Sequence, residues 1–137
     1  QGPYHSGLQR FVADLNRLYA AEPALWEADF EVEGFYWISC TDAENSVLAF
    51  VRQTRDLRSR LLVVLNLTPV LRTDYRLGLP APGRWREVLN SDAGLYGGAN
   101  HGNLGGLDAS GPGWHHQPHS ATVTLPPMSL LVFRQEP

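Results

Sequence analysis

Residues 74–106 read DYRLGLPAPGRWREVLNSDAGLYGGANHGNLGG, and this stretch is the most informative part of the chain about its fold. Its first half holds two short runs, residues 75–79 and 83–90, in which apolar residues recur with a period of two. That period is typical of strands, and the Pro-Ala-Pro-Gly turn between the runs predicts that they pair with each other. The second half is dense in Gly and Asn around Tyr96, which predicts an ordered loop whose glycines permit positive φ angles. We expect residues 91–118 to be irregular.

Further strands are predicted on both sides of this stretch, over residues 35–40, 47–53, 61–67, 121–125 and 129–133. The run LLVVLNL is apolar almost throughout, which predicts a central strand that is buried on both faces. We expect Leu62, Val64 and Leu65 to be among the most buried residues. Short strands at regular spacing, with turn signals between them, predict a mainly β chain folded as an antiparallel β-sandwich.

The first segment of the chain is predicted to be an amphipathic helix. Its apolar residues fall three and four apart, at Leu8, Phe11, Val12, Leu15, Leu18 and Tyr19. Ser6 and Gln9 fit a capping box, and Pro23 is expected to end the helix and to start a short second one. One helix cannot bury its apolar face alone, so we expect that face to pack outside the β core or to remain partly exposed. We assign residues 1–33 to a preceding domain and residues 34–137 to the sandwich.

Composition excludes several classes of function. The 137 residues carry a net charge of −3, all eleven basic residues are Arg, and there is no Lys for a Schiff base or a Walker A motif. A mildly acidic chain is poorly suited to nucleic acid, and no apolar run has the length of a membrane-spanning helix. Cys40 is the only cysteine, and the first residues lack the apolar core of a signal peptide. We therefore expect a soluble, cytoplasmic protein with no nucleic-acid or membrane partner.

The polar residues do not form a recognisable catalytic or metal-binding pattern. The glycine-rich loop lacks the GxGxxG spacing, and we interpret it as structural. The histidines lack the spacing of a zinc site; they are His5, His101, His115, His116 and His119. The acidic candidates are scattered and unpaired; they are Asp42, Glu44, Glu87, Asp92 and Asp108. We expect no catalytic residue, no metal and no cofactor in this chain.

Aromatic and arginine residues are the remaining candidates. Arg52, Arg55, Arg58 and Arg60 are expected to lie at a solvated hairpin tip. Trp37 and Trp85 alternate with strand neighbours, so we expect both in the core. Two further aromatic residues, Tyr96 and Trp114, lie in the predicted loop region, where binding residues concentrate. They are candidates for stacking on sugar rings, and the alternative is that they pin the loop onto the sandwich.

Four stretches together resemble the carboxy-terminal end of bacterial 1,4-α-glucan branching enzymes, which belong to the α-amylase superfamily. They are residues 74–106, LNLTPV at residues 65–70, HSATVTLPPMSLLVF at residues 119–133 and HSGLQRFVADLNRLYAAEPALWEADF at residues 5–30. The sequence departs from the family pattern at Leu67, where the family often has an aromatic residue, and at His116-Gln117, where Gly-Arg is common.

The resemblance implies the carboxy-terminal β-sandwich of an α-amylase-type enzyme, preceded by the last helix of its catalytic β/α barrel. The parent enzyme cleaves α-1,4-glucan and transfers the chain to a 6-hydroxyl through a covalent intermediate, as a retaining glycosyltransferase of glycogen biosynthesis. Its catalytic acids lie upstream, so this part is expected to support the barrel and to be inactive alone. The implied partners are the barrel of the same polypeptide and α-glucan, as glycogen or amylose, with Tyr96 and Trp114 as candidate contacts.

Two alternatives remain at this point. One is the same domain of another member of the superfamily, such as a trehalose-releasing or debranching enzyme. The other is a free-standing carbohydrate-binding sandwich, which would have no need of the helix.

Overall fold

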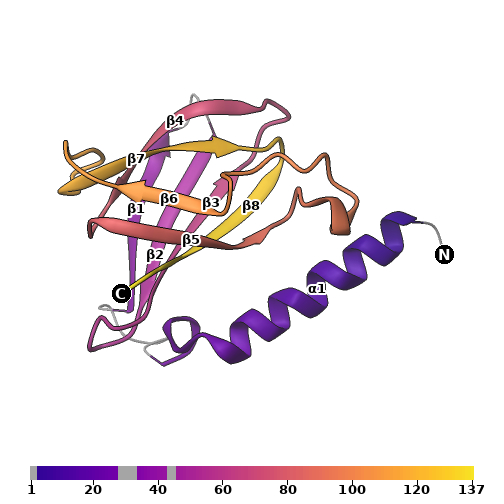
Figure 1. The fold of residues 1–137 in the computed structure, drawn as a ribbon, viewed down its shortest axis with the longest axis horizontal. Coiled ribbons are helices and arrows are strands. Elements are labelled where there is room, and N and C mark those ends of the chain that lie inside the picture. The colour runs from indigo at the N-terminus through magenta and orange to yellow at the C-terminus, as the bar shows by residue number, and fades with distance from the viewer. Residues whose placement is uncertain (1–2, 28–33, 43–45) are drawn as a thin grey trace.

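Alternating apolar and polar residues form eight strands in the computed structural model, which describes residues 3–27, 34–42 and 46–137. The strands are β1 Phe35–Asp42, β2 Val47–Gln53, β3 Arg60–Asn66, β4 Arg72–Leu79, β5 Gly83–Asn90, β6 Gly106–Ala109, β7 His119–Leu125 and β8 Ser129–Gln135. Six of them form one antiparallel sheet in the order β1-β2-β3-β8-β5-β6, and β4 pairs with β7 in a second sheet. The two sheets pack face to face, which confirms the predicted antiparallel β-sandwich (Figure 1).

The core lies between the two sheets and is built from the inward-facing residues of both. Its largest fully buried side chains are Val47, Val51, Leu62, Val64, Leu77, Leu79, Trp85, Val123, Leu125, Leu131 and Phe133. The strand β3 lies between β2 and β8, so the prediction of a central strand is confirmed. Leu62 and Val64 are fully buried as predicted, whereas Leu65 is only half-buried. Leu65 points to the outer face of the sheet and lies beyond the cluster of residues that covers Leu61 and Val63 there.

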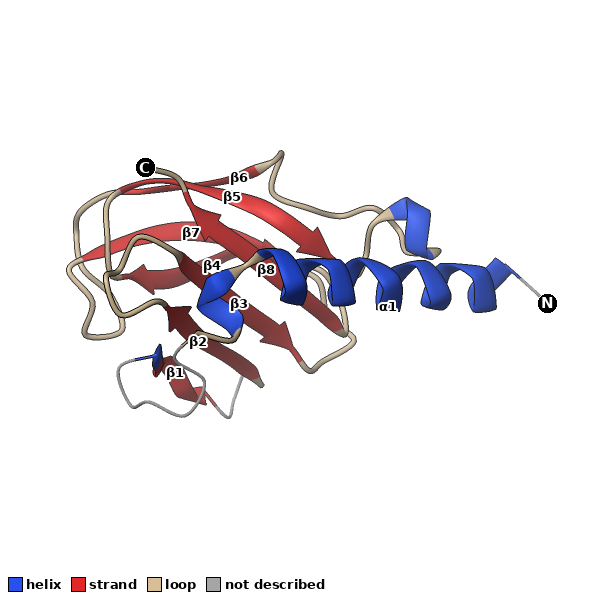
Figure 2. Ribbon diagram, turned by 90° about the horizontal axis from the view of Figure 1, so that it is seen from below, coloured by secondary structure: helices blue, strands red, loops and turns tan. Residues whose placement is uncertain are grey.

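A helix covers part of the outer face of the larger sheet. The helix α1 spans Pro3–Ala21 and is followed by the short 3₁₀ helix η1, Pro23–Leu25. Figure 2 shows α1 lying across the face of the sheet that points away from β4 and β7. Residues of the helices and the sheet meet there in a second apolar cluster, which includes Phe11, Leu18, Ala24, Leu61, Val63, Leu89 and Val132. The predicted helix face is therefore packed outside the core through Phe11 and Leu18, and the rest of it is exposed, in agreement with the prediction.

The ends of α1 agree with one predicted signal and not with the other. Pro23 follows directly after the end of the helix and begins η1, as predicted. The capping box of Ser6 and Gln9 is wrong, because the helix begins at Pro3 and both residues lie inside it. A proline is well suited to the first turn of a helix, since its fixed φ is helical and its missing N–H has no partner in that turn.

The strands on either side of the Pro-Ala-Pro-Gly turn do not pair with each other, which corrects the prediction from the sequence. β4 pairs with β7, and β5 pairs with β6 and β8. The turn carries the chain from one sheet to the other, and its Ala81 is buried. The indole N–H of Trp85 donates to the Ala81 carbonyl at 3.2 Å, which packs the turn onto the core. The turn is therefore buried against the core and connects the two sheets, and it does not close a hairpin.

The two tryptophans that were predicted to be in the core differ in their surroundings. Trp85 lies on β5 inside the sandwich and is fully buried, as predicted. Trp37 is 46 % exposed, so its predicted burial is wrong. It lies on the edge strand β1, on the outer face, where its ring packs edge-on against Phe35 at 5.3 Å and Phe50 at 5.7 Å.

The segment of residues 91–118 is more regular than predicted. It contains the 3₁₀ helix η3, Gly94–Tyr96, and the strand β6, which pairs with β5 at the edge of the larger sheet. β6 has four residues, which is too short for a period of two to be read from the sequence.

Substitution of Leu62 by Ala tests the central position of β3. We expect a loss of about 2–5 kcal/mol in the free energy of unfolding, because burial is lost and a cavity forms between the sheets. Leu67→Ala is the matched control, since Leu67 is exposed just beyond the strand and its loss should cost less than about 0.5 kcal/mol. Urea unfolding of both variants measures the difference, and equal midpoints would contradict the assignment.

Candidate functional site

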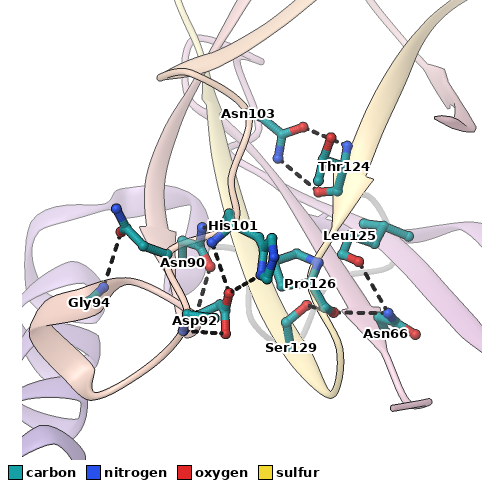
Figure 3. Close-up of polar contacts among 12 residues, drawn as sticks. Asn66, Asn90, Asp92, Gly94, His101, Asn103, Thr124, Leu125, Pro126 and Ser129 are labelled. Carbon is teal, nitrogen blue, oxygen red and sulfur yellow. Dashed lines mark hydrogen bonds and ion pairs between the residues drawn. The ribbon is translucent and has the colours of Figure 1, made fainter. Parts of the chain in front are cut away.

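The loop between β5 and β6 folds around the carboxylate of Asp92. Its two oxygens accept the backbone N–H groups of Ala99 at 3.2 Å and His101 at 2.9 Å, and the imidazole Nδ1 of His101 lies 3.0 Å away (Figure 3). The carbonyl of Asp92 accepts the N–H of Asn100 at 2.7 Å. A side chain at Gly98 could not be accommodated, since its Cβ would lie 2.3 Å from that same carbonyl oxygen. The predicted ordered loop is confirmed, and the partly buried carboxylate of Asp92 holds several of its backbone groups.

Two asparagines complete the loop from its inner side. The Asn90 side chain accepts the N–H of Asp92 at 2.8 Å and donates to the carbonyl of His101 at 2.7 Å. The Asn100 side chain accepts the N–H of Gly94 at 3.1 Å, which sets the start of η3. These contacts hold η3 in place relative to the end of β5 (Figure 3).

Asn103 ties the far end of the loop to the smaller sheet. Its side-chain oxygen accepts the N–H of Thr124 at 2.7 Å, and its nitrogen donates to the Thr124 carbonyl at 3.0 Å and to the Glu87 carboxylate at 3.1 Å. Asn66 acts similarly at the end of β3, where it is fully buried and donates to the carbonyls of Val70 and Pro126, both at 2.9 Å. Figure 3 shows both asparagines among the strand ends that they join.

Tyr96, one of the two candidate glucan contacts, is held against α1. Its hydroxyl donates to the Asp14 carboxylate at 2.5 Å, and its ring meets the ring of Phe11 edge-on at 5.2 Å. The approach is close enough that a Cβ at Gly7 would lie 2.2 Å from the Tyr96 carbonyl oxygen. Burial raises the pKa of the Tyr96 hydroxyl above its ordinary value, although the positive charge of Arg17 opposes the rise. The hydroxyl therefore remains a hydrogen-bond donor at neutral pH, and η3 attaches the loop to the helix.

A second set of polar contacts joins the end of the helical segment to the sheet. The buried carboxylate of Glu22 accepts a hydrogen bond from Arg134 of β8 at 2.6 Å. Arg52 donates to the carbonyl of Leu25 at 3.1 Å, and Arg55 pairs with Glu27 at 3.4 Å. The predicted solvated hairpin tip is confirmed for Arg55 and Arg58, which are exposed in the turn. It is wrong for Arg52, which lies within β2 and reaches back to η1. The sequence does not show these contacts of Arg52 and Arg55, because the partners are 27 and 28 residues away.

Trp114, the other candidate glucan contact, lies in the connection between β6 and β7. Its side chain is 48 % exposed. This connection and η3 are at opposite ends of the sandwich in both views (Figures 1 and 2). The structure therefore does not bring Tyr96 and Trp114 together in one site.

Three of the acidic candidates are engaged in structural contacts. Asp92 binds His101, Glu87 binds Asn103, and Asp108 pairs with Arg84 at 3.2 Å. Glu44 lies outside the described residues, as do the side chains of Asp42, Cys40 and His5. Across residues 3–27, 34–42 and 46–137, no three His, Cys, Asp or Glu side chains are grouped so that they could hold a metal ion.

No helix in the described ranges has both the length and the apolar character that a membrane span requires.

Comparison of the sequence with curated proteins finds relatives that match nearly the whole chain. Three of them are each named 1,4-alpha-glucan branching enzyme GlgB. The protein from Albidiferax ferrireducens is 51 % identical over 97 % of this chain and 21 % of its own length. Its counterpart from Cereibacter sphaeroides is 52 % identical over 94 % of this chain and 18 % of its own length. The relative from Aquifex aeolicus is 47 % identical over 98 % of this chain and 21 % of its own length. The chain therefore spans about a fifth of the length of these relatives.

A solved structure and a family model agree with the observed fold. A crystal structure of a MutB mutant, from crystals soaked with trehalulose, matches with a TM-score of 0.54 and 16 % identity, over 89 % of this chain and 17 % of that one. At this identity the likeness shows the fold alone. Residues 37–136 match the family model described as the alpha amylase C-terminal all-beta domain. Since that match covers nearly the whole sandwich, the chain belongs to the family of alpha amylase C-terminal all-beta domains.

Proposed function

We propose that this chain is the carboxy-terminal part of a 1,4-α-glucan branching enzyme. Identities of about half over nearly the whole chain support this choice, whereas the MutB structure shares only 16 % of its residues. That difference favours a branching enzyme over another member of the superfamily. The whole enzyme then cleaves α-1,4-glucan and transfers the cut chain to form α-1,6 branches. Its catalytic acids belong to the part of the polypeptide outside this chain, which accounts for roughly four-fifths of the relatives' length.

The proposed division assigns residues 1–33 to the catalytic barrel, as its last helix and tail, and residues 34–137 to the sandwich. The partners are then the barrel of the same polypeptide and α-glucan, as glycogen or amylose. The setting is glycogen biosynthesis in the cytoplasm, and the chemistry needs no cofactor because two carboxylates perform it.

The observation that carries the proposed role is that α1 has two apolar stripes. One stripe faces the sandwich, where Phe11 and Leu18 join the outer cluster. The other stripe remains exposed and consists of Leu8 at 60 %, Val12 at 47 %, Leu15 at 36 % and Tyr19 at 49 %. Neighbouring apolar side chains that are exposed together often mark contact surfaces in soluble proteins. We infer that α1 is shared, with the sandwich on one side and the rest of the barrel on the other.

The sandwich therefore supports the barrel by holding its last helix in place. Tyr96 and the ion pair of the buried Glu22 with the partly exposed Arg134 attach α1 and the segment after it to the sheet. Because the sandwich covers one apolar stripe of the helix, its removal would expose that stripe to water and destabilise the barrel.

The proposed function predicts that the full-length polypeptide has branching activity and that this chain alone does not. The full-length polypeptide should lower the iodine-complex absorbance of amylose and create α-1,6 linkages, which debranching with isoamylase would release as short chains. The 137-residue chain alone should leave the absorbance unchanged over a long incubation. Branching activity in the 137-residue chain alone would refute the proposed function, and so would a full-length polypeptide that does not branch amylose.

The shared helix predicts an effect that depends on the presence of the barrel. Val12→Asp should destabilise the full-length enzyme by about 2–4 kcal/mol, because it places an unpaired charge against apolar surface, and should have little effect on the isolated chain. Gln9→Asp is the matched control, since Gln9 is an exposed polar residue on the same helix. Thermal unfolding of both variants in both contexts measures the difference. An equal effect of Val12→Asp in the two contexts would contradict the shared helix.

The attachment through η3 predicts a cost for the loss of a single hydroxyl. Tyr96→Phe should lower the free energy of unfolding of the isolated chain by about 1 kcal/mol, since the partly exposed hydrogen bond to Asp14 is lost. Tyr19→Phe is the control, because Tyr19 lies on the exposed stripe. Urea unfolding of both variants tests this, and similar midpoints would show that the bond does not hold the helix.

A further inference from the structure

Trp114 is carried by a tight two-residue turn with an uncommon backbone. Trp114 and Gln117 exchange two backbone hydrogen bonds, of 3.1 and 2.9 Å. The residues between them, His115 and His116, have φ angles of 51° and 60°. Residues other than glycine rarely adopt this left-handed region, and two in succession form the tightest kind of hairpin turn. The position of Trp114 is thus set by a locally strained backbone.

Contacts with both strands of the smaller sheet, β4 and β7, keep this turn in place. The N–H of Gly78 in β4 donates to the imidazole Nδ1 of His115 at 3.1 Å. A Cβ at Gly78 would lie 2.0 Å from the Trp114 carbonyl oxygen, so the close approach requires glycine. The buried Ser120 hydroxyl donates to the carbonyl of Pro112 at 2.6 Å. Strained backbone that is fixed by its surroundings in this way is characteristic of binding sites.

The indole of Trp114 is held and yet remains half exposed. The guanidinium of Arg76 lies 5.4 Å from the centre of the ring, a distance typical of a cation–π contact. Arg76 is itself positioned by its Nε, which donates to the Ser120 hydroxyl at 3.2 Å. A ring fixed by such contacts loses little conformational freedom when a ligand stacks on it.

A polar groove runs beside Arg76 along the facing edges of β6 and β7. It consists of two adjoining hollows of about 230 and 370 Å³, both lined by Asp108, Ala121 and Thr122. The smaller hollow is lined further by Arg76, Ser110 and Ser120. Paired backbone hydrogen bonds between Ser110 and Ser120, of 3.0 and 2.7 Å, join the two edges in this part of the groove.

The groups in the groove suit a neutral, hydroxyl-rich ligand. Among the described residues, the terminal nitrogens of Arg76 have no hydrogen-bond partner, so they can donate to a ligand. The Asp108 side chain is largely exposed and pairs with Arg84 through one oxygen, which leaves the other to accept. Since a carboxylate stands beside the guanidinium, the groove does not favour an anion. Arg76 lines the smaller hollow and also lies over the ring of Trp114, so it connects the groove to the exposed indole. Hydrogen-bonding groups next to an aromatic side chain match the hydroxyl groups and the apolar face of a sugar ring.

We propose that Trp114 and this groove bind a linear α-1,4-glucan chain, with one glucose unit stacked on the indole and its neighbours along β6 and β7. The choice of α-1,4-glucan among neutral saccharides rests on the proposed function, whereas the site rests on the residues described above. Tyr96 takes no part, because its ring and hydroxyl are both engaged by α1.

Affinity electrophoresis of the 137-residue chain in gels with and without glycogen tests the site. We expect glycogen to retard the wild-type chain, and Trp114→Ala to weaken the apparent affinity at least about tenfold. Trp37→Ala is a closely matched control, since Trp37 is 46 % exposed and Trp114 is 48 % exposed. Urea unfolding shows whether each variant is folded. A titration of the wild-type chain with maltoheptaose, followed through the indole N–H resonance of Trp114, needs no variant and should show a saturable shift.

Each outcome decides the question. Absence of retardation, equal retardation of Trp114→Ala, or an equal loss in Trp37→Ala would overturn the site, as would an unshifted indole resonance. Failure of the site differs from failure of the proposed function. If the full-length polypeptide branches amylose while the groove binds no glucan, only the site is refuted. If the groove binds glucan and the full-length polypeptide does not branch it, the site stands and the proposed function falls.

Discussion

Leu62 and Val64 of β3 point into the space between the two sheets, while Leu61 and Val63 point to the opposite face of the same strand. A strand that is apolar on both faces needs a cover on each side, because every exposed aliphatic side chain costs about 1.5–3 kcal/mol relative to burial. The pair β4 and β7 covers one face, and the helical segment covers the other. The position of α1 therefore follows from β3, and a sandwich without the helical segment would leave this strand in contact with water.

The apolar face of the helix is divided between two surroundings. Part of it completes the outer cluster of the sandwich, and the other part, Leu8, Val12, Leu15 and Tyr19, is exposed. The contact is also specific, since Gly7 permits the close approach of η3, and Asp14 receives the hydroxyl of Tyr96. Apolar burial supplies most of the stabilisation, and the polar contacts fix the position along the helix at which η3 attaches.

The irregular segments are ordered by a few buried or partly buried polar side chains. Asp92, Asn103 and Asn66 each satisfy several backbone groups that would otherwise lose their hydrogen bonds on burial. At the opposite end of the sandwich, His115 accepts the N–H of Gly78 and Ser120 donates to the carbonyl of Pro112, which holds the turn that carries Trp114. Loops held in this way present side chains in fixed positions, which is what both the helix contact and the proposed glucan groove require.

The sequence by itself determined the class of fold, the positions of most strands, the central place of β3 and the end of the helix at Pro23. It also indicated the family through the stretch around Tyr96. These features are local, because a period of two, an apolar run or a proline acts within a few residues. Only the tertiary structure decided that β4 leaves β5 to pair with β7, that Trp37 is exposed at an edge, and that Tyr96 meets Asp14 from 82 residues away. Pairing partners and burial depend on which surfaces meet in space, and no local pattern in the chain specifies that.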